Sequence, residues 1–139
     1  MGNENKIDGV IDNVSGVITS EILEDAVAQP EVQLVHRCAI STQVDEYMVM
    51  PFDGEIKEIS TVIAGAITTP DETITFNNGV AGDELGVITI AFTGSAAGVV
   101  DSLVPIRNYS FSAGDVLEMK IGGESTNSPQ CDIVILYQG

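Results

Sequence analysis

The chain has 139 residues, 44% of them hydrophobic, which is enough for one domain with a substantial core. Its 21 acidic residues outnumber its 5 basic ones, and a net charge of -16 argues against binding to nucleic acid or to an anionic membrane surface. Aromatic residues are scarce, so Val and Ile must fill the core, and the many Gly, Thr and Ser residues favour strands and turns.

Residues 1–31 form a strongly acidic segment that differs in composition from the rest of the chain. Within it, Thr19–Gln29 is expected to form a short helix with Ile22 and Leu23 on its apolar side. We predict an N-terminal arm here, either a partly ordered leader or a segment that lies on a neighbouring subunit. The segment lacks a basic stretch followed by an apolar core, so we expect no signal peptide and synthesis in a cytoplasm.

Residues 32–139 alternate apolar and polar side chains with the period of two that predicts strands. The expected fold is all-β: a jelly-roll-like antiparallel sandwich of about eight strands. The expected strands are Val32–Ile40, Val44–Met50, Glu55–Ala64, Glu72–Asn77, Gly86–Thr93, Arg107–Ser112, Leu117–Ile121 and Cys131–Gln138.

Three of these strands and one pair of cysteines carry specific expectations. Glu55–Ala64 also fits a helical spacing, but its Thr, Val and Ile content favours a strand. The strand Gly86–Thr93 is expected to place Phe92 on its apolar face, and the last strand is expected to be buried on both faces. Because the first and last strands of a jelly roll are neighbours, Cys38 and Cys131 are expected to lie close together as buried free thiols.

The connection Gly94–Pro105 is long for a hairpin loop and unusually apolar. Exposed loops are ordinarily polar, so this one is expected either to fold back onto its own core or to meet another subunit. The candidate interface residues are Val99, Val100, Leu103 and Val104 of this loop, together with Ile22 and Leu23 of the arm.

No arrangement of residues in the sequence predicts catalysis. The single histidine, His36, lies on the apolar side of its strand and is expected to pack in the core or an interface rather than act as a base. The acid pairs Asp45-Glu46, Asp71-Glu72 and Asp83-Glu84 lack the spacing of a calcium loop and are expected to be solvated. We therefore predict a protein that is not an enzyme and that needs neither a metal nor a cofactor.

Several stretches from Pro51 onward carry a resemblance to a known family. They are Pro51–Ile56, Val62–Thr69, Asp71 with Thr73–Thr75, Ile88–Gly98, Val100–Ser102, Ser112–Val116 and Gly123–Thr126. The run Gly94–Ser102 and the turn Ala113-Gly114-Asp115 are the most specific of them. On these stretches the last two thirds of the chain resembles the head decoration, or cement, proteins of tailed bacteriophages.

The resemblance implies a virion protein on the outer surface of an icosahedral capsid, commonly a homotrimer, that bridges major capsid subunits without doing chemistry. An acidic sandwich with an apolar loop suits this role, because a protein that binds the assembled lattice better than free subunits favours the intact shell. The alternative is a carbohydrate- or receptor-binding jelly-roll module of a virion fibre, although the chain has no Trp to offer as a sugar platform.

Overall fold

The computed structural model describes residues 30–122 and 125–139, and Glu31–Gly139 forms one compact unit. The expected helix, with Ile22 and Leu23, lies outside the described residues. The described residues form nine strands and no helix. The strands are β2 (Glu31–Ala39), β3 (Asp45–Val49), β4 (Gly54–Ile63), β5 (Glu72–Asn78), β6 (Asp83–Ile90), β7 (Val100–Leu103), β8 (Ser110–Phe111), β9 (Val116–Ile121) and β10 (Gln130–Gln138).

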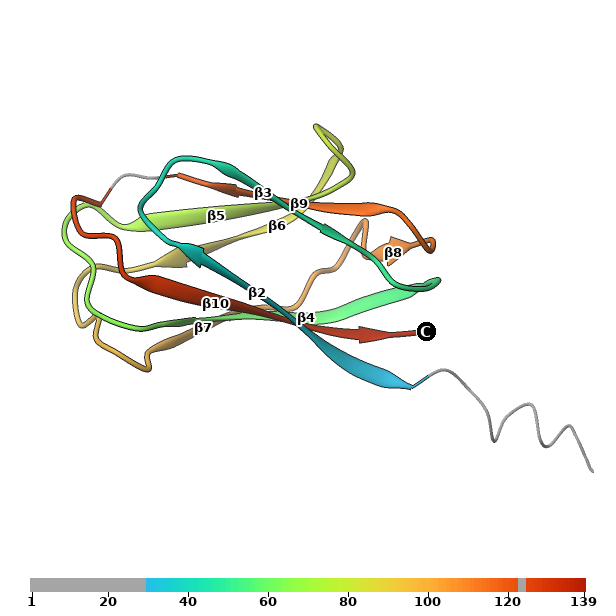
Figure 1. Ribbon diagram of the computed structural model, residues 1–139, viewed down its shortest axis with the longest axis horizontal. Coiled ribbons are helices and arrows are strands. Elements are labelled where there is room, and N and C mark those ends of the chain that lie inside the picture. The colour runs from blue at the N-terminus through green and yellow to red at the C-terminus, as the bar shows by residue number, and fades with distance from the viewer. Residues whose placement is uncertain (1–29, 123–124) are drawn as a thin grey trace, which may run out of the picture. The chain divides into compact units, whose positions relative to one another are not determined.

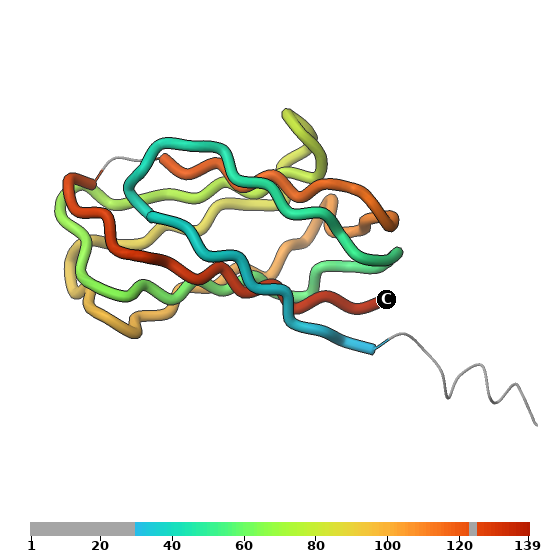
Figure 2. The backbone as a smooth tube through the Cα atoms, in the orientation of Figure 1, coloured from blue at the N-terminus to red at the C-terminus, as the bar shows by residue number. Residues whose placement is uncertain are grey.

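The strands form two antiparallel sheets that lie face to face (Figure 1). The first sheet has the order β2-β10-β4-β7, with β8 paired to the start of β4, and the second has the order β3-β9-β5-β6. The chain crosses between the sheets at every connection except β5–β6 and β7–β8, and the crossings can be followed along the tube in Figure 2. This topology confirms the predicted jelly-roll-like sandwich.

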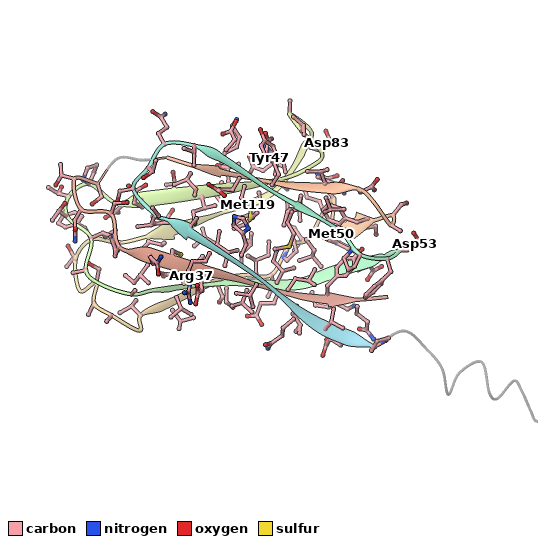
Figure 3. All side chains as sticks on the ribbon, viewed as in Figure 1. Arg37, Tyr47, Met50, Asp53, Asp83 and Met119 are labelled. Atoms are coloured by element: carbon pink, nitrogen blue, oxygen red, sulfur yellow. The ribbon has the colours of Figure 1, made fainter. Side chains whose placement is uncertain are left out.

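The core lies between the two sheets and consists mainly of Ile side chains. Figure 3 shows Met119 of β9 in this interior layer. On β10, Ile133 and Ile135 are fully buried, whereas the alternate residues Val134 and Leu136 are only half-buried. The prediction that the last strand is buried on both faces is therefore wrong for its outer face, because no described element covers that side of the first sheet.

The structure resolves the ambiguity of β4 in favour of a strand and explains its helix-like spacing. The pairing of β4 with β10 shifts register at a bulge, where Leu136 faces Glu58 and Tyr137 faces Ile56. Lys57 is the extra residue at this bulge, so Ile56 and Ile59 both reach the core although they are three residues apart.

Two aromatic residues lie differently from what the alternation predicted. β6 ends at Ile90, so Phe92 falls in the following loop and is exposed, while its N–H donates to Asp71 Oδ1 at 3.0 Å. The expected strand around Tyr109 is reduced to the two residues of β8. Phe111 is buried there and Tyr109 is exposed, so these two rings lie in different environments.

The expected closeness of the two cysteines is confirmed. Cys38 on β2 and Cys131 on β10 are directly opposite each other in the antiparallel register, and both are buried free thiols.

Candidate interaction surface

The apolar stretch predicted as a loop contains a strand, β7, at the edge of the first sheet. Among the described strands β7 is hydrogen-bonded to β4 alone within this sheet. Just before β7, the Ile63 N–H donates to the Val99 carbonyl at 3.3 Å, and the Gly98 N–H donates to the Ile63 carbonyl at 2.8 Å. The stretch therefore has an inner and an outer side, and its apolar residues divide between them.

The inner side of this stretch packs on the core. Val99 and Leu103 are half-buried against the core residues. Gly86 on β6 makes room for Leu103, because a Cβ at Gly86 would lie 2.8 Å from Leu103 Cδ2. This close approach joins the edges of the two sheets, so Val99 and Leu103 serve the fold of this chain.

The outer side of the same stretch is exposed. Val100 is 57% exposed and Val104 64% exposed, and Ile106 in the next turn is 80% exposed. Val62 of β4 is opposite Val100 in the register and extends the apolar surface from the edge toward the centre of the sheet. Large apolar side chains are therefore exposed together at this edge of the first sheet.

A shallow groove borders these residues at the end of β7. Its volume is about 400 Å³, and it is lined by Val104, Pro105 and Ile106 together with Tyr109 and the side chain of Lys57. The wall is mostly apolar, with two charged residues, Lys57 and Glu55, at its margin.

The apolar surface continues across the outer side of the first sheet to β2. Val35 on β2 is 59% exposed and faces Val134 of β10 in the register. Leu136 of β10 lies on the same side because its neighbours along the strand are buried inward. We call this surface the apolar face; it comprises Val35, Val62, Val100, Val104, Ile106, Val134 and Leu136.

Two ion pairs lie on or beside the apolar face, and Glu58 of β4, opposite Leu136 in the register, is a further acidic residue on that side. Arg37 donates to both carboxylate oxygens of Asp132, at 2.7 and 3.2 Å. This hydrogen bond lowers the pKa of Asp132 and raises the pKa of Arg37. Lys57 lies 3.4 Å from Glu55 at the margin. These two pairs offset part of the charge on this side of a chain whose net charge is -16.

The outer side of the second sheet is different in character. Tyr47, which Figure 3 shows on the outside of β3, is exposed there, as is Val87 of β6. Thr73 and Thr75 of β5 lie between these two strands and interrupt the apolar surface. The second sheet therefore offers a matched control surface, with exposed apolar residues that lie further apart across the sheet.

The candidate interface residues predicted from the sequence fall into three groups. Val100 and Val104 lie on the apolar face, Val99 and Leu103 pack inward, and Ile22 and Leu23 are outside the described residues. Sequence reasoning missed Val35 and Ile106. Val35 occupies the otherwise polar side of its strand, between Gln33 and Arg37, and that interruption was the available signal.

The side chains of His36 and Glu72 both have hydrogen-bond partners within the fold. His36 Nε2 lies 2.7 Å from Glu46 Oε1, and this half-buried pair joins β2 to β3. Glu72 contradicts the expectation of solvated acids: it is fully buried, and its Oε2 accepts a 2.6 Å hydrogen bond from the Ser125 N–H.

Within residues 30–122 and 125–139, no three His, Cys, Asp or Glu side chains are placed to hold a metal ion. In the same residues no helix is long and apolar enough to cross a membrane.

Comparisons with known proteins place the fold among capsid chains. No family model matches this sequence, and no curated protein matches it. A chain in the acid-stable capsid structure of Helicobacter pylori bacteriophage KHP30 superposes with a TM-score of 0.59 at 9% identity, covering 81% of this chain and 90% of that one. A chain in the capsid of cyanophage Pam1 superposes with a TM-score of 0.50 at 10% identity, covering 81% and 86%. What these chains share with this protein is the fold.

Proposed function

We propose that this protein is a structural component of a phage virion that decorates and stabilises the outer surface of an icosahedral capsid. The observation that carries the proposal is the fold shared with chains of two phage capsids over most of both partners. Because similar shares of both chains are covered, those capsid chains are close to this one in length. A single small sandwich fits an auxiliary capsid protein better than a major coat protein.

The apolar face is the surface that binds the major capsid protein in this proposal. Its Val, Leu and Ile side chains release water on burial, and the Arg37–Asp132 pair enters the contact with its charges already paired. The strong negative charge of the chain limits sticking between particles. A copy that bridges two capsid subunits favours the assembled shell by mass action, and many copies make modest contacts effective.

The copies are proposed to act as homotrimers, as the sequence resemblance implies. Three copies placed around a symmetry axis of the shell would each contact a different capsid subunit, which is the geometry that bridging requires. The mass of the free protein, measured by light scattering, tests this part by itself.

The test of the binding surface uses heads of the encoding phage assembled without this chain. The double variant Val100→Asp/Val104→Asp adds two charges to the apolar face. The matched control, Val49→Asp/Val87→Asp, adds the same charges to exposed valines of the second sheet. In co-sedimentation with the heads, the first variant is expected to bind at least about tenfold more weakly than wild type, because buried apolar contacts are lost. The control is expected to bind like wild type.

Two results would overturn parts of this proposal separately. Equal binding by the two variants, with both folded, would remove the apolar face as the capsid contact. Failure of the wild-type chain to bind any head, together with its absence from purified virions by mass spectrometry, would remove the capsid role itself.

A further inference from the structure

The two cysteines form a feature of the first sheet that capsid binding does not use. Cys38 and Cys131 are the two cysteines of the chain, and they face each other across β2 and β10. Both side chains are on the inner side of the sheet, with Cys38 8% exposed and Cys131 0% exposed. They lie on the opposite side of the sheet from the apolar face.

The backbone register gives this pair a spacing that a disulfide can span. The Ile40 N–H donates to the Pro129 carbonyl at 3.1 Å, which makes Ile40 and Pro129 a hydrogen-bonded pair of the antiparallel ladder. Two residues further along, Cys38 and Cys131 are the next such pair. Cα atoms at hydrogen-bonded pairs lie about 5.5 Å apart, within the range of about 4.4–6.8 Å seen for disulfides. Their Cβ atoms lie about 5.5 Å apart and must approach to about 3.5–4.5 Å, so the bond forms with a small local shift of the edge strand β2.

The Cys131 thiol donates a long hydrogen bond, of 3.8 Å, to the Asp132 carbonyl. The interaction between the two thiols lowers the pKa of Cys38 and, together with burial, raises the pKa of Cys131. Cys38 is therefore the member that reaches the thiolate form more readily, and it is also the more exposed of the two. Cys131 is the buried partner held against it.

We propose that Cys38 and Cys131 are a modification site, at which a peroxide converts the two thiols into an intramolecular disulfide. The Cys38 thiolate attacks one peroxide oxygen, the O–O bond breaks, and hydroxide leaves, so that Cys38 becomes a sulfenic acid. Cys131 gives its proton to that hydroxide, and its thiolate attacks Cys38 Sγ. The S–O bond breaks and the second oxygen leaves as hydroxide, which takes up the proton that Cys38 had released to the solvent on forming its thiolate. Two thiols are oxidised, and one peroxide is reduced to two waters.

The disulfide would fasten an edge strand to the centre of the sheet. Among the described strands, β2 is hydrogen-bonded to β10 alone, so it is the strand most easily detached on this side. A bond between Cys38 and Cys131 would close a loop that contains most of the sandwich, which restricts the unfolded chain strongly. The oxidised protein is therefore the more stable form.

The experiment uses the full reduced chain and hydrogen peroxide. After exposure, the protein is denatured, alkylated with iodoacetamide and weighed by mass spectrometry. We expect neither cysteine to be alkylated. The mass of the protein is then expected to be lower than that of the reduced, unalkylated chain by two hydrogen atoms. On a non-reducing gel the protein is expected to run as a monomer. The unfolding midpoint is expected to rise by roughly 10 °C and to return after dithiothreitol treatment.

The variant Cys131→Ser supplies the matched control. Cys38 alone is expected to stop at the sulfenic acid, which dimedone traps, and the unfolding midpoint is expected not to rise. The proposal is overturned if the wild-type chain keeps two alkylated thiols at peroxide doses that give the dimedone adduct in the variant. Disulfides that join two chains, instead of closing within one, would overturn it equally.

Discussion

At the scale of single residues, Glu118 shows how an acid on the outer side of a strand becomes buried. It alternates with the inward-facing Leu117 and Met119 on β9, and yet it is almost fully buried. Asn77 Nδ2 and the Ala81 N–H both donate to Glu118 Oε1, each at 3.0 Å. The hydrogen bond from Asn77 is the main reason why the pKa of Glu118 is lowered.

This arrangement predicts a loss of stability in acid. Because the pKa of Glu118 is lower in the folded state than in the unfolded state, its contribution is present above the ordinary value of 4.5 and is lost as the pH falls through the folded value. Urea unfolding at a series of pH values should show a smaller acid-side decline for Glu118→Gln than for wild type. Asn77→Ala, which keeps the Ala81 donor, should lie between them. Identical declines in all three proteins would contradict this role for Glu118.

At the scale of the elements, β10 and β7 contribute in different ways. β10 lies between β2 and β4 and carries the fully buried Ile135. β7 lies at the edge and carries the exposed Val100. The central strand therefore stabilises the sandwich, whereas the outer side of the edge strand carries exposed apolar side chains.

A pair of substitutions tests this division. Ile135→Ala should lower the free energy of unfolding by about 2–5 kcal/mol, because it leaves a cavity between the sheets. Val100→Thr keeps a β-branched side chain at the surface and should change that free energy by about 0.5 kcal/mol or less. Urea unfolding of both variants measures the two effects. A large loss from Val100→Thr would mean that its side chain belongs to the core.

The elements also show how far the sequence alone can lead. Strict alternation was sufficient to predict β2, β5, β9 and β10, because each buries one side against the other sheet. The stretch around β7 is predicted as a loop because it lies between two expected strands, and its apolar composition alone does not reveal a strand. Its two environments depend on β6 and β4, which are distant in sequence. Val35 and Ile106 were missed for the same reason, since a face is defined only when the strands are assembled.

At the scale of the whole molecule, the two sheets present unequal surfaces. The outer side of the first sheet carries the apolar face with the Arg37–Asp132 ion pair beside it, whereas threonines separate the exposed apolar residues of the second sheet. A protein with one apolar side and a strong negative charge elsewhere can bind a shell through the apolar side while its charged surface faces solvent. This asymmetry makes the proposed decoration role testable, because only the first sheet is expected to contact the shell.

The most direct test is a cryo-EM reconstruction of the virion of the phage that encodes this chain. The account predicts density for this sandwich on the outside of the shell, with the β2-β10-β4-β7 sheet turned toward the major capsid protein and Val100 and Val104 buried in the contact. A virion whose shell lacks this density, or a sandwich attached through β3-β9-β5-β6 with the apolar face in solvent, would contradict it.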